Sequence, residues 1–155
     1  RGAYDILEWL TLPPHNLHLD GICDFIDNTK TLLWLHQHGA YMNWGRTKRC
    51  ALIYNDVDLL KACLGHVVFE EDDLMDALLK WNYEAVIFLV DVVGLVFSED
   101  MMKIYLYRMS TYYTSPACIP KLLSVTKSLF VRFGDDMSVE MRNKYDSFLS
   151  TLSKR

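Results

Sequence analysis

Glycine and proline are scarce in this chain, with seven and four residues among 155. So few turn-forming residues exclude collagen-like and disordered chains and favour helices joined by short loops. Long apolar runs are lacking too, because the longest, residues 85–97, is interrupted by Asp91 and is too short to cross a bilayer. We therefore expect a globular chain without a membrane span.

An excess of positive charge is also lacking, since the formal net charge is −4. A nucleic-acid surface needs surplus lysine and arginine to neutralise phosphates. The one local basic cluster, Arg46, Lys48 and Arg49, is too small to supply it. We expect no specific nucleic-acid partner.

The four cysteines are Cys23, Cys50, Cys63 and Cys118, widely spaced within apolar segments. Disulfide frameworks belong to smaller and more cysteine-dense secreted chains. The spacing therefore predicts reduced, buried thiols and an intracellular location, in the cytoplasm or nucleus.

The sequence has few motifs of the kinds that bind phosphate or metal ions or that catalyse reactions. Neither a Walker loop nor a Gly-x-Gly-x-x-Gly loop occurs. The close pairs Cys63/His66 and His36/His38 lack the further ligands of a zinc site. A Cys–His nucleophile pair stays open, because such partners meet in space, but no local signature marks one. We predict a non-enzyme with no catalytic residue, metal or cofactor.

Internal repetition is the most informative feature. Apolar segments recur around Leu33, Leu60 and Val86, at intervals of 27 and 26 residues. A second apolar segment precedes the later two, around Ala51 and Ala77, again 26 residues apart. A fixed period of this size is typical of stacked supersecondary units. The unit it predicts is a helix, a tight turn, a helix and a loop.

Residues that favour turns and helix ends occur between and at the ends of the predicted helices. They are the turn asparagines Asn28, Asn55 and Asn82, the glycines Gly39, Gly65 and Gly94 after the second helices, and the N-caps Ser98, Ser115 and Asp72 or Asp73. Asparagine tolerates left-handed turn geometry, glycine commonly ends helices, and serine or aspartate commonly begins them.

The C-terminal part differs from the repeats. We predict a connector over residues 128–134 and then an amphipathic helix over residues 136–153. Its apolar positions recur every three or four residues: Met137, Met141, Tyr145, Phe148 and Leu152. Such a helix would cover the open end of a repeat array.

The expected fold is an all-α solenoid of stacked helix-turn-helix units in one domain, residues 1–155. The units span approximately residues 17–42, 43–69, 70–96 and 97–126. Composition alone would also allow a buried strand at residues 85–93, but the position of this run in the repeat predicts a helix.

Two segments of the sequence resemble a known family. The stretch Leu33-Trp34-Leu35-His36-Gln37-His38-Gly39 and the stretch Ala51-Leu52-Ile53-Tyr54-Asn55-Asp56 resemble divergent, short-period ankyrin repeats of the kind found in large DNA viruses, amoebae and algae. The resemblance covers roughly residues 17–125. The Thr-Pro-Leu-His start of the common 33-residue unit is absent. The resemblance implies binding to another protein.

The candidate partner-binding residues are Asn43, Trp44, Arg46, Lys48, Arg49 and, as an outlier, Trp81. Tryptophan, tyrosine and arginine dominate interface hot spots. Trp44 is expected in a loop beside Arg46, where it would have little packing role. The alternative that it packs back over the preceding repeat stays open.

Two other functions stay open as well. One is a compact helical bundle that inhibits signalling or cell death, of the viral type, by holding a partner helix in a groove. The other is a small structural subunit of a large assembly.

Overall fold

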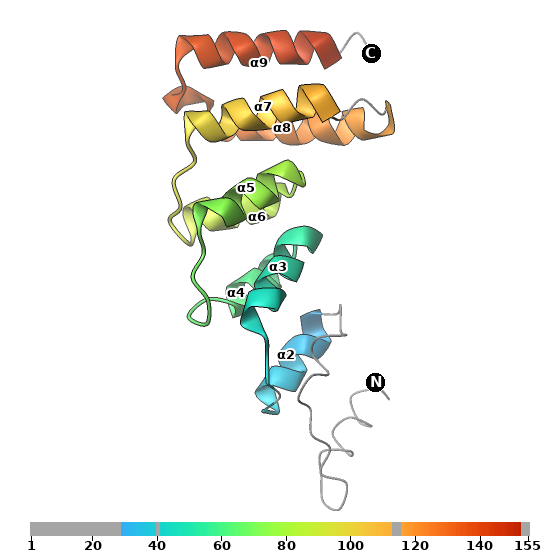
Figure 1. Cartoon of the computed structure of the whole chain (residues 1–155), viewed down its shortest axis with the longest axis vertical. Coiled ribbons are helices and arrows are strands. Elements are labelled where there is room, and N and C mark those ends of the chain that lie inside the picture. The colour runs from blue at the N-terminus through green and yellow to red at the C-terminus, as the bar shows by residue number, and fades with distance from the viewer. Residues whose placement is uncertain (1–28, 40, 113–115, 153–155) are drawn as a thin grey trace, which may run out of the picture. The chain divides into compact units, whose positions relative to one another are not determined.

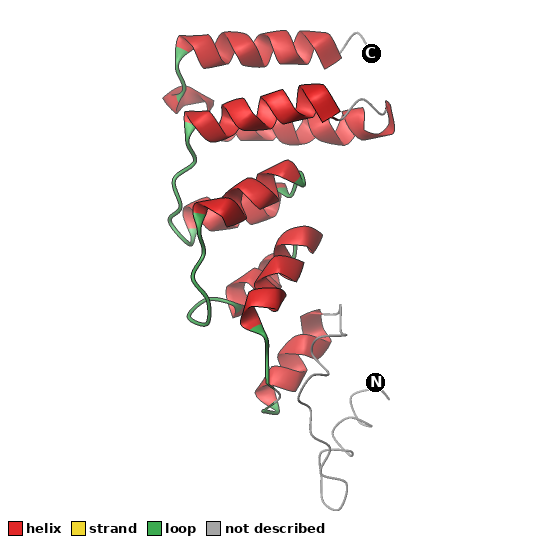
Figure 2. Ribbon diagram, in the orientation of Figure 1, coloured by secondary structure: helices red, strands yellow, loops and turns green. Residues whose placement is uncertain are grey.

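The computed structural model describes residues 29–39, 41–112 and 116–152, and these residues form helices and loops without a strand (Figures 1 and 2). The α-helices are α2 (Thr29–Gln37), α3 (Trp44–Tyr54), α4 (Val57–Ala62), α5 (Glu71–Leu79), α6 (Tyr83–Asp91), α7 (Glu99–Tyr112), α8 (Ile119–Phe133) and α9 (Val139–Leu152). Short 3₁₀ turns, Pro116–Cys118 and Gly134–Asp136, precede α8 and follow it. The predicted all-α class is confirmed, and residues 85–91 are helical.

The described residues divide into two compact units. The first contains residues 29–51, apart from residue 40, and residues 56–68. The second contains residues 52–55, 69–112 and 116–152. Helix α3 supplies its first eight residues to the first unit and its last three to the second.

The turn after α3 and the turn after α5 share the same backbone hydrogen-bonding pattern. Asp56 N–H donates to the carbonyl of Ala51 at 2.9 Å, and Asn82 N–H donates to the carbonyl of Ala77 at 3.0 Å. Each bond follows a residue in the left-handed region, Asn55 at φ 57° and Trp81 at φ 61°. The 26-residue interval predicted from Ala51 and Ala77 is therefore present in these hydrogen bonds.

Asn55 and Asn82 both lie in the turns between paired helices, as predicted, but their backbone positions differ. The left-handed residue of the second turn is Trp81, and Asn82 instead precedes the first residue of α6. The equivalent of Asn55 is Trp81 because the interval is 26 residues, whereas the two asparagines are 27 apart. Asn28 lies outside the described residues. Gly39, Gly65 and Gly94 all have positive φ, as expected for helix ends.

The first unit is built on the packing of α2 against α4. Leu35 and Leu60 are fully buried, and Leu32 and Leu59 nearly so. Thr29 donates its hydroxyl to the carboxylate of Asp56, which also accepts the N–H of Leu59 and so caps α4. The apolar faces predicted around Leu33 and Leu60 are thus buried against each other.

In the second unit, helices pack in successive layers. Helix α5 contacts α6 and α7, α6 contacts α8, and α9 contacts α7 and α8. The hydroxyl of buried Tyr105 on α7 lies 2.8 Å from the hydroxyl of Thr126 on α8. Apolar side chains from every helix fill the spaces between layers, among them Leu74, Leu89, Met102, Leu122 and Met141.

The C-terminal boundaries need correction. Helix α8 continues to Phe133, through the predicted connector and past the unit boundary placed at residue 126. Gly134, the glycine of the predicted connector, directly follows the last residue of α8, whose inner side buries Leu129 and Phe133. Helix α9 begins at Val139, later than the predicted residue 136. The five apolar positions predicted for it are all buried, as expected.

The helix caps were predicted in part. The Ser98 hydroxyl accepts the N–H of Met101 at 3.2 Å, which confirms this cap. Before α5 the cap is Glu70, one turn earlier than expected, and the Asp73 carboxylate accepts the Glu70 N–H at 2.8 Å. Ser115 lies outside the described residues.

The thiols differ in burial. Cys63 is fully buried, as predicted. Cys50 and Cys118 are only half-buried, so the prediction was wrong for them. Cys23 lies outside the described residues. None of the described helices combines the length and the apolar character that a membrane crossing requires.

Candidate functional site

Five of the six candidate residues begin helix α3, in the first unit. They form what we call the α3 patch: Asn43, Trp44, Arg46, Lys48 and Arg49. Asn43 caps the helix, since its side-chain oxygen accepts the N–H of Arg46 at 3.1 Å. Trp44 was expected in a loop, but it is the first residue of the helix. Asn43, which was expected in a loop, caps a helix that begins at Trp44, well before the apolar segment predicted around Ala51.

Trp44 also has a packing role, which agrees with the alternative that it packs back over the preceding segment. Its ring stacks on His66 with centroids 4.0 Å apart and planes 5° from parallel. The ring of His36 meets it edge-on at 4.8 Å. Trp44 is therefore half-buried between α2 and the loop after α4, and the inference that it lacks packing partners was wrong.

The charged members of the α3 patch are differently placed. The Lys48 ammonium donates to the carbonyl of Val68 at 3.1 Å, so this half-buried side chain ties α3 to the loop after α4. Arg46 and Arg49 are exposed. They lie three residues apart on one helix, so they share one side of it. The exposed members of the patch are thus Asn43, Arg46 and Arg49, and Trp44 is half-buried.

Trp81, the sixth candidate, belongs to the second unit and lines a groove there. We call it the hairpin-end groove, and its volume is about 680 Å³. It is lined by Ile53, Tyr54, Asn55, Trp81, Asn82, Tyr83, Glu84, Lys121, Ser124, Val125 and Ser128.

Two asparagines hold the walls of this groove together. Buried Asn82 donates its side-chain amide to the carbonyls of Leu52 and Ile53, the latter at 3.1 Å. Asn55 accepts the N–H of Ala85 at 3.0 Å and donates to the Glu84 carboxylate. Each side chain joins residues 52–55 to the first turn of α6. The groove is therefore a fixed feature of the second unit.

Trp81 occupies an unfavourable backbone conformation in this groove. A left-handed φ costs a residue with a Cβ about 1–2 kcal/mol, and bulky residues rarely adopt it. The indole N–H of Trp81 points to the Met109 sulfur at 2.8 Å, and the Lys121 ammonium lies 6.0 Å from the ring centroid. The indole is half-buried and keeps an accessible edge.

Sequence reasoning missed the α8 side of the groove. Lys121, Ser124 and Ser128 recur at helical spacing on the face opposite Leu122 and Leu129, which are buried. That polar stripe is visible in the sequence. It was overlooked because α8 was expected to end before Ser128, which left too few turns to reveal it.

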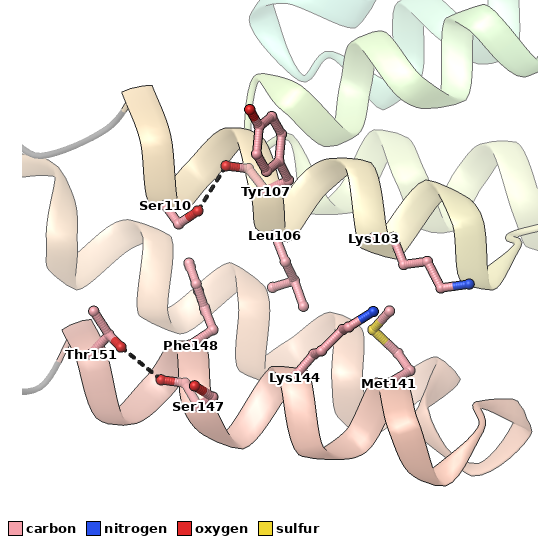
Figure 3. Close-up of a pocket in the computed structure, with 9 residues that line it drawn as sticks. All are labelled: Lys103, Leu106, Tyr107, Ser110, Met141, Lys144, Ser147, Phe148 and Thr151. Atoms are coloured by element: carbon pink, nitrogen blue, oxygen red, sulfur yellow. Dashed lines mark hydrogen bonds between the residues drawn. The ribbon is translucent and has the colours of Figure 1, made fainter.

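A second hollow of about 440 Å³ lies between α7 and α9 (Figure 3). Leu106 and Phe148 point toward each other across it, and Lys103 and Lys144 lie near one end. Both lysines are paired: Lys103 with Glu99 and Asp100, and Lys144 with Glu140. Hydrogen bonds from Ser138 and the nearby Lys103 hold the pKa of Glu99 below its ordinary value. This hollow is therefore lined by apolar side chains and by lysines whose charges are balanced by nearby carboxylates.

Metal and thiol chemistry find little support in the described residues. Within residues 29–39, 41–112 and 116–152, no three His, Cys, Asp or Glu side chains gather where they could hold a metal ion. Burial raises the pKa of the Cys63 thiol to about 11, and the charge of Lys48 offsets only part of this. A neutral thiol is a poor nucleophile.

Comparisons with known proteins returned nothing: no family model, no curated protein and no solved structure matches this chain.

Proposed function

We propose that this chain is a non-catalytic protein-interaction module, a solenoid of short ankyrin-like helical hairpins whose last layer is covered by α9. Its partner is another protein, bound through the α3 patch and through the hairpin-end groove at Trp81. The observation that carries this proposal is the placement of two half-buried tryptophans. Trp44 begins α3, the helix that carries the exposed Arg46 and Arg49, and Trp81 lies in the turn after α5 with the Lys121 ammonium 6.0 Å from its ring centroid.

The repeated turn geometry supports a hairpin array. The bonds from Asp56 to Ala51 and from Asn82 to Ala77 recur at the interval of the apolar pattern. A compact bundle around one long central helix fits less well, since the longest described helix, α8, has 15 residues. A repeat array presents side chains along a rigid extended surface, which is the usual basis of protein binding by such folds.

The residue types on these surfaces support a protein partner. Trp44 with Arg46 and Arg49, and Trp81 with Tyr54 and Tyr83, are the types enriched at interface hot spots. A backbone conformation as unfavourable as that of Trp81 persists only where surrounding structure enforces it, and such outliers concentrate at functional positions.

Affinity capture tests the proposal. The full chain, its double variant Trp44→Ala/Arg46→Ala and the single variant Trp81→Ala are immobilised in turn, and captured proteins are identified by mass spectrometry. Asn143→Ala, an exposed change on α9, is the control. We expect the wild type and the control to retain one partner that at least one surface variant loses. Equal recovery by every variant would place the binding surface elsewhere, and no stoichiometric partner at all would refute the proposed function.

A further inference from the structure

The charge on the outer face of α8 is unusual for this acidic chain. Lys121 and Lys127 are exposed, and neither is paired with a carboxylate among the residues that the structure describes. By contrast, Lys103 and Lys144 on the neighbouring helices have carboxylate partners. The face of α8 therefore carries two uncompensated cations although the chain's net charge is −4.

These cations belong to one continuous hollow. A further depression, lined by Tyr83, Lys127, Ser128, Val131 and Arg132, shares Tyr83 and Ser128 with the hairpin-end groove. Together the two run along α8 from Lys121 to Arg132. Eleven residues of helix rise about 16 Å, which matches about five residues of an extended peptide.

The carboxylates along this hollow are already engaged. Glu84 accepts a hydrogen bond from the Asn55 amide, and Asp91 binds Arg132 at 2.8 Å. Neither carboxylate forms an ion pair with Lys121 or Lys127. Ser124 and Ser128 also line the hollow, and their hydroxyls can bond to a peptide backbone.

Apolar contacts complete the surface. Trp81 and Tyr83 are half-buried, Tyr54 is 64% exposed, and Val131 at the far end is 84% exposed. Exposed apolar side chains beside aromatic rings offer a place for an apolar side chain of a ligand. The hollow thus alternates apolar contacts with uncompensated positive charge.

We propose that the hairpin-end groove and its continuation along α8 bind an acidic peptide segment of a partner protein. Its carboxylates face Lys121 and Lys127, and an apolar or aromatic side chain packs against Trp81 and Tyr83. This inference rests on the proposed function, since it names the class of partner for one of its surfaces.

A peptide fits better than a nucleic acid. Two cations neutralise too few phosphates for stable nucleic-acid binding. An acidic peptide needs only a few charge contacts, because apolar anchors supply most of the affinity and charge supplies selectivity.

Selection from a displayed library of random peptides tests the inference with the full chain as bait. Enriched peptides are then synthesised and their affinities measured by fluorescence anisotropy. The variants are Lys121→Glu/Lys127→Glu and Trp81→Ala, and the control is Lys30→Glu/Arg108→Glu, which changes the net charge equally at two other exposed positions. Circular dichroism verifies that each variant is folded.

We expect enrichment of peptides that combine aspartate or glutamate with an apolar or aromatic residue. Their affinity falls at least about tenfold in the α8 double variant and in Trp81→Ala, whereas the control changes it about twofold or less. Affinity also falls as salt concentration rises.

Three results would overturn the inference. The first is enrichment of peptides without an acidic excess, or none at all. The second is binding that survives Lys121→Glu/Lys127→Glu but is lost in Trp44→Ala/Arg46→Ala, which would leave the proposed function standing on the α3 patch. The third is tighter binding of a single-stranded oligonucleotide than of the peptides, with an oligonucleotide affinity that also falls in Lys121→Glu/Lys127→Glu.

Discussion

The side-chain amide of Asn82 donates a hydrogen bond to the carbonyl oxygen of Ile53, 3.1 Å away in space and 29 residues away in sequence. Asn82 is buried and Ile53 is partly exposed, so this bond is partly shielded from water. It holds one wall of the hairpin-end groove against the next, so the stability of the second unit and the shape of its groove depend on the same side chain.

Replacing Asn82 tests that dependence. Asn82→Ala leaves the carbonyls of Leu52 and Ile53 without their buried donor, and we expect it to lower the free energy of unfolding by about 2 kcal/mol. Urea denaturation followed by circular dichroism measures the change. Asn143→Ala, at an exposed position of α9, should change stability by less than about 0.5 kcal/mol. Equal effects at both positions would argue against the bridging role of Asn82.

The backbone of Trp81 can be tested separately from its indole. Trp81→Gly and Trp81→Ala both remove the ring, but only alanine retains a Cβ at φ 61°. We expect the glycine variant to be more stable than the alanine variant by about 1 kcal/mol. In the middle of α9, at Asn143, the order should reverse, because alanine favours a helix by about 1 kcal/mol over glycine. The same order at both sites would contradict a left-handed Trp81.

Ser138 joins the start of α9 to α7. Its hydroxyl accepts the N–H of Met141 at 3.2 Å and donates to the Glu99 carboxylate at 2.9 Å. We expect Ser138→Ala to lower the free energy of unfolding by about 1 kcal/mol near neutral pH. The pKa of Glu99 is lower in the folded chain, so its stabilising contribution is present above the unfolded pKa and disappears as pH falls through the folded value.

The cost of Ser138→Ala should therefore shrink in acid. Thermal denaturation at neutral and at acidic pH provides the comparison, and Ser138→Thr, which can keep both bonds, should restore most of the loss. A cost that is the same at both pH values would show that Glu99 does not contribute through Ser138.

The buried thiol of Cys63 predicts a loss of stability in alkali. Burial raises the pKa of Cys63 to about 11 in the folded chain, above the value of an exposed cysteine. The stabilising contribution of the neutral thiol is complete below the unfolded pKa and declines as pH rises toward the folded value. Between pH values of about 8 and about 10.5, wild type should lose more unfolding free energy than Cys63→Ala. Parallel pH dependences would contradict the raised pKa.

The helices with strong local signals could be predicted from the sequence. The apolar interval located α2, α4, α5 and α6, and the spacing of Met141, Tyr145 and Phe148 located α9. These predictions succeeded because burial of one helical face leaves a periodic pattern that survives without tertiary information.

The groove could not be predicted, because it depends on contacts between distant residues. Asn82 and Ile53 are 29 residues apart, and Trp81 and Lys121 are 40 apart, so no local pattern records that they meet. The stacking of Trp44 on His66 was missed for the same reason. The extent of α8 was missed because its last residues are held by the burial of Leu129 and Phe133, which depends on the neighbouring helices.

Hydrogen–deuterium exchange of the chain, alone and bound to the partner isolated by affinity capture, tests the central claim most directly. Binding through the proposed surfaces predicts slower exchange on complex formation at the start of α3, around Trp44 and Arg46, or at the α5–α6 turn and α8, around Trp81 and Lys121. Protection confined to α9, with these segments exchanging as in the free chain, would contradict it.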